Sequence, residues 1–295
     1  MKSEVRNPKS EIRNSLPIGI FDSGVGGLTV YRALHERLPD EHFVYLGDTA
    51  RVPYGTKSLA TVERYATENS KFLESHGIKL LVVACNTASA LALPAIRNTL
   101  SVDVVGVIDP GAHAAVAKAN GKRIGVIATE ATVQSGAYAH SISRIDQAAL
   151  VIERACPLFV SLAEEGWADT DVAQSVAEQY MSDLRRCDLG ALVLGCTHYP
   201  ILSRVISEAI GTDVPLIDSG EATASEVKSL LESQGLGRPE AMRRDRERHL
   251  CDDLDHFYVT DAAQRFAKVA ERFLGAAPAV LEAVELWGHD ELRTY

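Results

Sequence analysis

The sequence LVVACNT at residues 81–87 is an apolar run that ends in a cysteine and two polar residues. A similar stretch, LVLGCTH, occupies residues 192–198. Apolar runs of this length, bounded by polar residues and followed by helical patterns, are typical of strands buried in a parallel sheet. The two stretches therefore predict two buried strands, each with a cysteine at its carboxyl end.

A second pair of similar stretches indicates that the chain consists of two related halves. IGI at residues 18–20 and IGV at residues 124–126 each open an apolar run that leads into a polar loop. The two members of this pair are separated by nearly the same number of residues as the two cysteine-containing stretches. Chance likeness between buried strands is the alternative for either pair alone, but the two pairs together favour a duplication.

Short runs rich in β-branched residues alternate with longer helical patterns through most of the chain, which predicts βαβ units. Strands are expected at residues 18–21, 43–46, 80–84, 103–107, 123–128, 149–152, 190–194, 214–217 and 256–260. The predicted fold class is α/β, with two similar domains of mostly parallel sheet flanked by helices and an active site in the cleft between them. We expect a loose N-terminal arm at residues 1–15, a first domain at residues 16–109 and 221–295, and a second domain at residues 110–220.

Two C-terminal segments extend this plan. The strand and helix expected within residues 256–274 should pack back on the first domain. Residues 235–255 contain glycines, a proline and the charged run RRDRER at residues 243–248. A solvated connection is the default interpretation of such a segment.

The composition is that of an ordinary globular protein. The chain has 295 residues, of which 46% are hydrophobic and 24% charged, and a net charge of -10 without a dense Lys/Arg block. These values exclude a disordered chain and a broad nucleic-acid surface. Residues 1–15 lack the apolar core of a signal peptide, and polar residues and Pro94 interrupt the apolar stretch 79–96. The five cysteines are scattered through the sequence, as is typical of reduced thiols, so we expect a cytoplasmic protein. We expect no membrane partner.

Ligands of open parallel sheets bind beyond the carboxyl ends of the strands, so the polar tips there are the candidate site. Four tips stand out, at residues 22–27, 48–55, 85–87 and 196–200. The first contains Gly24 and Gly26, but Thr29 replaces the third glycine of a dinucleotide-binding loop, and the lysine of a P-loop is missing. What remains is a loop of backbone N–H groups suited to a small anion, with a purely structural tight turn as the alternative.

Cys85 and Cys196 are the sharpest feature, because they end matching strands of the two halves. They should face one another across the cleft, where a helix N-terminus would favour the thiolate. A reducing cytoplasm disfavours a disulfide between the two cysteines. The spacing of the cysteines and histidines in the sequence disfavours a zinc site. A cysteine hydrolase needs one thiol, whereas two thiols on opposite faces of a carbon suit racemisation. The other three cysteines, Cys156, Cys187 and Cys251, are interpreted as structural.

Neither a cofactor nor a metal is expected. Pyridoxal phosphate requires a Schiff-base lysine, and Lys57, the nearest candidate, fits a solvated loop better. Without it, a carbanion would be stabilised by preorganised hydrogen-bond donors. Such donors are available at Ser23, Asn86, Thr87 and Thr197, in addition to the backbone. Asp22 and His198 would then assist the two thiols.

Four segments closely resemble the glutamate racemases: IGIFDSGVGGLTV at 18–30, GDTARVPYG at 47–55, VACNTAS at 83–89 and LGCTHYP at 194–200. The resemblance spans roughly residues 17–274 and implies a cofactor-independent racemase with two α/β domains and the active site between them. It also implies interconversion of L- and D-glutamate, supply of D-glutamate for peptidoglycan, and a homodimer. A binding module without catalysis and a hydrolase that uses one thiol remain the rival hypotheses.

The resemblance also implies roles for individual residues. Cys85 is expected to act on the D-isomer and Cys196 on the L-isomer. The substrate-contacting positions are Asp22, Ser23, Pro53, Tyr54, Gly55, Asn86, Thr87, Thr197 and His198. Residues 156–166 are similar to an acidic segment of the family, in which we favour Glu164 over Glu165 as the carboxylate near the second cysteine. The chain departs from the family before Leu16, at Asp109 and over residues 235–255.

Overall fold

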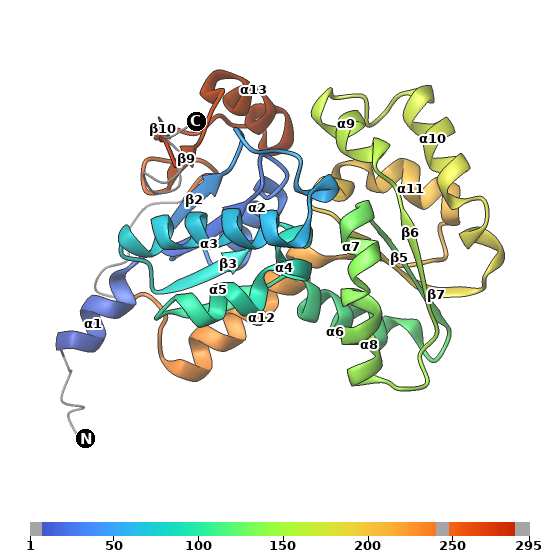
Figure 1. The fold of residues 1–295 in the computed structure, drawn as a ribbon, viewed down its shortest axis with the longest axis horizontal. Helices are drawn as coiled ribbons and strands as arrows, with labels where there is room; N and C mark the ends of the chain where they lie inside the picture. Colours follow the sequence, from blue (N-terminus) through green and yellow to red (C-terminus); the bar gives the residue numbers. More distant parts are fainter. Residues whose placement is uncertain (1–7, 240–247, 287–295) are drawn as a thin grey trace.

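The computed structural model describes residues 8–239 and 248–286, and it contains two separate parallel sheets (Figure 1). The first sheet has the strand order β10-β9-β2-β1-β3-β4 and the second has the order β6-β5-β7-β8. The strands of the first sheet are β1 (Ile18–Asp22), β2 (Phe43–Gly47), β3 (Leu80–Val83), β4 (Asp103–Gly106), β9 (His256–Val259) and β10 (Leu281–Ala283). Those of the second are β5 (Arg123–Ala128), β6 (Val151–Ala155), β7 (Leu189–Gly195) and β8 (Leu216–Asp218).

The two sheets share one topology. In the first, β1 pairs with β2 and β3, and β3 pairs with β4; in the second, β5 pairs with β6 and β7, and β7 pairs with β8. Each half thus repeats the same order of four strands. The predicted fold class, two similar domains of parallel sheet flanked by helices, is confirmed.

Both faces of each sheet are covered, which is why the strands read as continuous apolar runs. In the first sheet, Ile18 and Ile20 face one hydrophobic cluster, while Leu81 and Val83 belong to another on the opposite face. Glycine is required where a side chain packs closely on a strand: a Cβ atom at Gly19 of β1 would lie 2.7 Å from a methyl group of Ile78.

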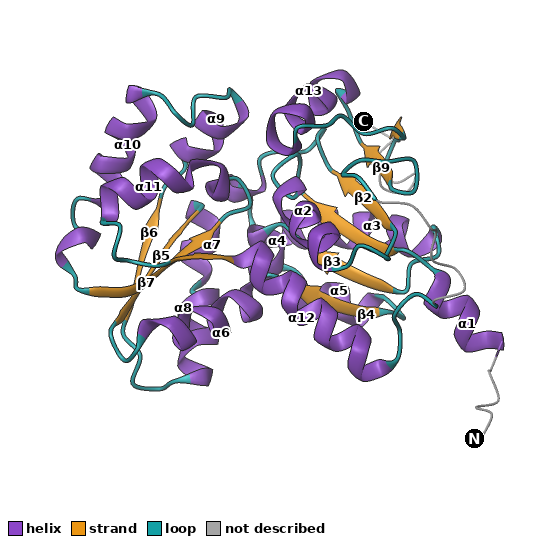
Figure 2. Ribbon diagram, turned by 180° about the vertical axis from the view of Figure 1, so that it is seen from behind, coloured by secondary structure: helices purple, strands orange, loops and turns teal. Residues whose placement is uncertain are grey.

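Helices surround the sheets (Figure 2). Those that precede the second sheet in sequence are α1 (Pro8–Ser15), α2 (Leu28–Arg37), η1 (Tyr54–Thr56), α3 (Leu59–Ser75), α4 (Asn86–Leu91), α5 (Leu93–Thr99) and α6 (Ile108–Ala119). The others are α7 (Glu130–Ser135), α8 (Ala137–Ile145), α9 (Leu158–Glu164), α10 (Asp171–Met181), η2 (Leu184–Arg186), η3 (Tyr199–Leu202), α11 (Ser203–Ile210), α12 (Ser219–Gln234) and α13 (Ala263–Leu274). None of the helices in the described part of the chain combines the length and the hydrophobicity that a membrane span requires.

Helix α12 joins the two halves. It packs against α2 of the first half and against α6 of the second (Figure 2). Asp218 caps its N-terminus by accepting a hydrogen bond from the backbone N–H of Gly220, and Gly235 ends it in the left-handed conformation, with φ of 63°. The domain boundaries suggested by the sequence remain a prediction.

The predicted strands differ most from the observed ones in three places. The strand expected at residues 149–152 is β6 at Val151–Ala155, the one expected at residues 214–217 is β8 at Leu216–Asp218, and β10 at Leu281–Ala283 was not predicted. β10 has three residues, one half-buried and two exposed, so it carries little of the apolar pattern that marks a strand. It is recognised by its parallel pairing with β9, which in turn pairs with β2.

The described ends of segment 235–255 are partly buried, which corrects in part the expectation of a solvated connection. Arg238, Cys251 and Asp255 are buried, whereas His249 and Asp253 are exposed. Arg248 donates hydrogen bonds to Asp255, which is fully buried, and to the backbone oxygen of Glu41. Arg238 is also buried, and its backbone N–H donates to the carboxylate of Glu41. Charged residues can be buried in this way when each one is paired. Residues 240–247 lie outside the described part of the chain.

The N-terminal arm is helical where the structure describes it. Residues Pro8–Ser15 form α1, whereas the sequence suggested a loose arm over residues 1–15. The end of α1 is held by Lys79, whose Nζ donates to the backbone oxygen of Asn14 at 2.9 Å, and by Arg238, which donates to that of Ser15 at 2.7 Å. Lys79 also forms a buried 2.6 Å ion pair with Glu41. The remaining seven residues of the arm are outside the described part.

Candidate active site

A small cavity of about 60 Å³ lies between the two halves, at the carboxyl ends of the strands. Its walls come from both sheets, as expected for a ligand site in this class of fold. The lining residues are Ser23, Gly24, Val52, Pro53, Tyr54, Gly55, Cys85, Asn86, Thr87, Thr129, Val160, Glu164, Cys196, Thr197 and His198. All the predicted site residues except Asp22 line this cavity, and Asp22 lies behind Ser23 at the end of β1.

Cys85 is the N-cap residue of α4 and is 6% exposed. Its Sγ atom accepts a hydrogen bond from the backbone N–H of Ala88 at 3.5 Å and donates one to Oγ of Ser23 at 3.4 Å. Burial raises the pKa of Cys85 to about 12, and the charge of Asp22 adds to this effect. The sequence suggested a thiolate stabilised by the helix N-terminus, but desolvation outweighs the helix and keeps Cys85 a neutral thiol at pH 7.

Asp22 occupies part of the anion site predicted in the glycine loop. Its Oδ2 atom accepts a 2.8 Å hydrogen bond from the backbone N–H of Gly24, so the protein's own carboxylate uses this donor. Oδ1 is buried and has no hydrogen-bond partner among the described residues. Burial raises the pKa of Asp22, against the opposing charge of His198 and the hydrogen bonds from the loop. Asp22 is therefore a fully buried carboxyl group close to Cys85.

Cys196 is the first member of a chain of three side chains. Nδ1 of His198 lies 3.7 Å from Sγ of Cys196, and Nε2 of His198 lies 3.1 Å from Oε1 of Glu164. Burial lowers the pKa of His198, but hydrogen bonds to Cys196 and Glu164 outweigh this effect and raise it to about 10. Burial raises the pKa of Glu164, and the bond with His198 more than reverses it, so that pKa is lowered. At neutral pH, a charged imidazolium therefore lies between a carboxylate and the sulfur of Cys196.

Glu164, rather than Glu165, is the acidic residue beside the second cysteine. Glu165 is exposed and reaches Arg265 at 3.7 Å. Arg265 also approaches Glu164 at 3.4 Å, and Arg272 donates a hydrogen bond to the backbone oxygen of Glu164. Both arginines belong to α13 of the first half, whereas Glu164 ends α9 of the second half. These contacts connect the halves at one edge of the cavity.

Glu164→Gln is expected to lower the pKa of His198 by about 1 to 3 pH units, because a charged partner is lost. In the wild-type protein, the folded state keeps the proton of His198 up to about pH 10, whereas the unfolded chain releases it near pH 6.5. This interaction therefore stabilises the fold fully below pH 6.5, and the stabilisation is lost as the pH rises toward 10. An NMR titration of the histidine ring signals measures the pKa, and urea unfolding at pH 7 and pH 9.5 measures the stability.

Two further variants complete this titration. His198→Gln identifies the signal of His198 by its disappearance. Glu165→Gln removes a neighbouring exposed carboxylate and should leave the pKa of His198 unchanged. A pKa of His198 that stays near 10 in Glu164→Gln would contradict the assignment of Glu164.

Threonine hydroxyls form another contact between the halves. Oγ1 of Thr87, from α4, lies 3.0 Å from Oγ1 of Thr129 and 3.2 Å from Oγ1 of Thr132, both in the second half. Thr129 and Val160 line the cavity but were not predicted to do so, whereas Gly24 and Val52 lie within the predicted tips at residues 22–27 and 48–55. The internal repeat contained a signal for Thr129, since its loop follows β5 as the loop of Ser23 follows β1.

Tyr54 lines the cavity, but its hydroxyl is bonded to residues of the first half. The hydroxyl donates to the carboxylate of Asp48 and accepts a 3.0 Å hydrogen bond from Nδ2 of Asn69. Arg51 donates to both carboxylate oxygens of the same Asp48, at 2.8 and 3.0 Å. This buried network fixes the loop that carries Pro53, Tyr54 and Gly55, so its polar groups are committed to the protein itself.

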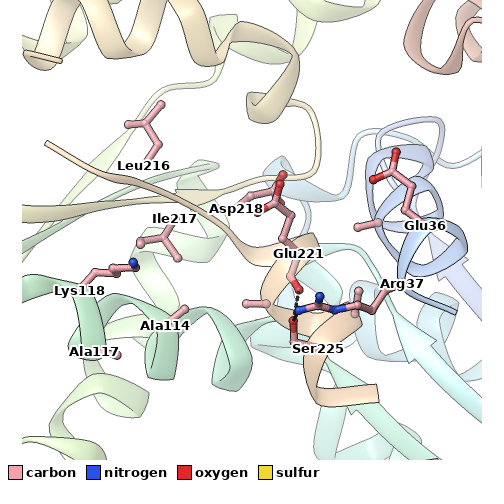
Figure 3. Close-up of a pocket in the computed structure, with 13 residues that line it drawn as sticks. Glu36, Arg37, Ala114, Ala117, Lys118, Leu216, Ile217, Asp218, Glu221 and Ser225 are labelled. Atoms are coloured by element: carbon pink, nitrogen blue, oxygen red, sulfur yellow. Dashed lines mark hydrogen bonds between the residues drawn. The ribbon is translucent and has the colours of Figure 1, made fainter. Parts of the chain in front are cut away.

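A larger groove of about 500 Å³ lies away from these residues, between α2, α6, β8 and α12 (Figure 3). Charges of both signs line it, including Glu36, Arg37, Lys118 and Glu221. Arg37 donates a 2.8 Å hydrogen bond to Ser225 across the groove. Among the described residues, the lining of this groove includes neither a cysteine nor a histidine, and its acidic and basic groups do not converge on one point (Figure 3). Within the described residues, no group of three or more His, Cys, Asp and Glu could hold a metal ion.

The fold and the site define a two-domain α/β enzyme with one cysteine from each half in a shared cavity. Residues 18–227 match the model of the Asp/Glu/Hydantoin racemase family. Curated relatives include the glutamate racemase of Geobacter metallireducens, 54% identical over 88% of this chain and 92% of the relative. The glutamate racemase of Thermus thermophilus is 48% identical over 92% of this chain and 96% of its own. The chain therefore belongs to the Asp/Glu/Hydantoin racemase family, and it is an isomerase.

Solved structures of the same family agree with the fold. The glutamate racemase of Francisella tularensis in complex with D-glutamate has a TM-score of 0.83 and 38% identity, over 92% of this chain and 98% of that one. The Thermus thermophilus enzyme in complex with β-chloro-D-alanine has a TM-score of 0.81 and 45% identity, over the same shares of the two chains.

Proposed function

We propose that this protein interconverts L- and D-glutamate by moving the α-proton between two cysteines. The observation that carries the proposal is that Cys85 and Cys196, from opposite halves, line one cavity. Abstraction of a proton from one face of the α-carbon and delivery to the other face inverts the stereocentre. The high identity to glutamate racemases supports glutamate as the substrate.

The surroundings of the two thiols suit opposite tasks. His198 is charged at neutral pH and lies 3.7 Å from Sγ of Cys196, so it stabilises negative charge on that sulfur. Cys85 keeps its proton because it is buried beside Asp22. The pair is therefore set for L-glutamate: Cys196 removes a proton and Cys85 donates one.

Each turnover balances protons within the pair. The Cα–H bond of L-glutamate breaks and an S–H bond forms at Cys196, while the S–H bond of Cys85 breaks and a new Cα–H bond forms on the opposite face. After the reaction, Cys196 carries the proton and Cys85 does not. The return reaction from D-glutamate starts from this state, in agreement with the expected roles of the two cysteines.

Hydrogen-bond donors in the cavity suit the two carboxylates of glutamate. Nδ2 of Asn86 is buried and without a partner among the described residues, and the hydroxyl groups of Ser23, Thr87 and Thr197 lie in the same walls. Preorganised donors of this kind stabilise the negative charge that develops in the transition state.

Transfer of deuterium from D2O to L-glutamate tests the proposed function. Wild-type protein should incorporate deuterium at the α-carbon, measured by NMR, while the optical rotation of the solution falls to zero. Bound glutamate that keeps its α-proton would favour a binding module. Turnover of an amide or ester that depends on one cysteine alone would favour a hydrolase, and faster turnover of aspartate would change the substrate.

Activity is expected to need neither a metal nor pyridoxal phosphate, because the thiols and the donors above supply the acid, the base and the stabilisation. Exhaustive dialysis against a chelator should leave kcat/KM within about twofold of its starting value, as no part of the proton transfer is removed. An undialysed sample of the same preparation is the control. Loss of activity that a metal or pyridoxal phosphate restores would contradict this expectation.

The wider role follows from the proposed chemistry. We infer that the enzyme works in the cytoplasm, supplies D-glutamate for peptidoglycan, and acts as a homodimer. Free thiols at all five cysteines are compatible with a reducing compartment. The exposed side chains of Leu158, Trp167 and Val172, beside and within α9 and α10, are large apolar groups that a second copy could cover. Size-exclusion chromatography with light scattering would distinguish a dimer from a monomer.

A further inference from the structure

Tyr138 connects the two loops that carry the cysteines. It lies in the first turn of α8 and is fully buried. Its hydroxyl donates a 2.8 Å hydrogen bond to Oδ1 of Asn86, the residue that follows Cys85. Its ring packs against Gly195, the residue that precedes Cys196. A single side chain of the second half therefore contacts both neighbours of the reacting thiols.

Two glycines make room for this ring. A Cβ atom at Gly195 would lie 3.0 Å from Cε2 of Tyr138, and one at Gly111 would lie 3.3 Å from Cε1. Because both residues are glycine, the ring packs closely against the backbone of α6 and β7. This packing restrains the position of the hydroxyl group.

The hydrogen bond determines which way the amide of Asn86 faces. Burial raises the pKa of Tyr138, so the phenol keeps its proton at neutral pH and donates it. The carbonyl oxygen of the amide faces this donor, and Nδ2 is turned the other way. Nδ2 is buried and has no hydrogen-bond partner in the described part of the chain.

An unpaired donor in a buried wall points to a ligand. Buried polar groups are nearly always hydrogen-bonded, so a free N–H group requires an explanation. Asn86 is 2% exposed and lines the cavity. Its Nδ2 group is thus available to a carboxylate in the cavity, provided that the amide does not rotate. In a rotated amide, the carbonyl oxygen would face the carboxylate and repel it.

We propose that Tyr138 is a positioning residue, which holds the amide of Asn86 so that Nδ2 donates a hydrogen bond to a carboxylate of the substrate. This inference rests on the proposed function and deepens it. Tyr138 lies behind the residues that line the cavity, so it acts through Asn86 and does not touch the substrate.

A double-mutant cycle on the racemisation of L-glutamate tests the proposal. Tyr138→Phe keeps the ring and removes the hydroxyl, and it is expected to lower kcat/KM about 10-fold, mainly through a higher KM. Asn86→Ala should lower kcat/KM about 100-fold. Because Tyr138 acts through Asn86, kcat/KM of the double variant should be no more than about 2-fold lower than kcat/KM of Asn86→Ala alone. Losses that multiply in the double variant, or a wild-type KM in Tyr138→Phe, would overturn the proposal.

Tyr31→Phe is the matched control. The hydroxyl of Tyr31 is equally buried, donates to Asp255 at 2.8 Å and accepts from the backbone N–H of Cys251 at 2.8 Å. None of these three residues lines the cavity. Removal of the Tyr31 hydroxyl should lower the melting temperature and leave KM unchanged. This variant therefore shows the effect of losing a buried hydroxyl that has no role in substrate binding.

Asn86→Asp gives an answer even if Tyr138→Phe does not fold. Aspartate keeps an oxygen for Tyr138 and replaces the Nδ2 donor by a second oxygen. KM should rise at least about 10-fold, because two carboxylates then face one another; an unchanged KM would overturn the proposal. An inactive wild-type protein would contradict the proposed function and this inference with it. An active wild-type protein whose losses multiply would overturn this inference alone.

Discussion

Alanine at Cys85 or at Cys196 is expected to lower kcat/KM for racemisation about 1,000-fold or more, because each thiol serves one face of the α-carbon. The loss must be the same for L- and D-glutamate. Enantiomers have equal free energies, so the two values of kcat/KM stay equal in every variant. The rate at which optical rotation disappears, starting from either enantiomer, measures the loss.

Exchange of the α-proton with D2O separates the roles of the two cysteines. With Cys196→Ala, the thiol of Cys85 remains, so D-glutamate should slowly gain deuterium without inversion while L-glutamate keeps its proton. Cys85→Ala should show the reverse. Equal exchange of both enantiomers by one variant would contradict the assignment of one cysteine to each face.

Cys156→Ala is the control for the loss of a buried thiol. Cys156 is fully buried, and burial also raises its pKa to about 12, but it does not line the cavity. This variant should keep kcat/KM within about twofold of the wild-type value and show only a lower melting temperature. Racemisation at the wild-type rate by Cys85→Ala or Cys196→Ala would rule out the two-cysteine mechanism.

The architecture could be predicted because its physical cause is local in the sequence. Strands covered on both faces must be apolar throughout, so runs such as residues 80–83 and 189–195 stand out. The repeat then indicated two similar halves, and four strands of each sheet follow the same order. β10 escaped prediction because it is short and lies at the edge of its sheet, where little of it is buried.

The positions of site residues were largely predictable, because strand ends in parallel sheets converge. This rule predicted that Cys85 and Cys196 lie in one cavity. It also applies to Thr129, which follows β5. It could not find Val160, an apolar residue of α9 with the appearance of a core position. Nor could it show that the hydroxyl of Tyr54 turns away toward Asp48.

Electrostatics depended on burial, which the sequence does not give directly. A cysteine at a helix start suggested a thiolate, yet Cys85 lies beside the buried Asp22, and its pKa is raised to about 12. The charges of Arg238 and Arg248 suggested exposure to solvent, yet Arg238 is buried and the side chain of Arg248 is only 8% exposed. Their partners Glu41 and Asp255 are distant in the sequence, so no local pattern links them to the two arginines.

Gly26→Ala is expected to lower kcat/KM about 100-fold with little loss of secondary structure. A Cβ atom at Gly26 would lie 2.2 Å from Oγ1 of Thr197 and 2.5 Å from Nδ1 of His198. Gly26 belongs to the loop of the first half, whereas Thr197 and His198 follow β7 of the second half. The added methyl group must therefore push the two halves apart at the cavity or displace the imidazole ring.

Either displacement should affect catalysis more than folding. Proton transfer requires both sulfurs in line with the α-carbon, and a misplacement of about 1 Å can cost about 100-fold in rate. The neighbouring hydrogen bond from Oγ1 of Thr29 to the backbone oxygen of Thr197, at 2.8 Å, ties the same two segments and limits how far they can adjust. Steady-state kinetics and circular dichroism of the variant measure the two effects separately.

Gly237→Ala is the matched control for the loss of a glycine, since a Cβ atom there would meet nothing within 4 Å. It should leave kcat/KM unchanged. The contact at Gly26 also predicts how the Gly26→Ala variant fails: the pKa of His198 should fall, because its hydrogen bonds to Cys196 and Glu164 lengthen. A Gly26→Ala enzyme with wild-type kcat/KM would mean that catalysis tolerates a different spacing of the halves, and the close approach at Gly26 would then serve packing alone.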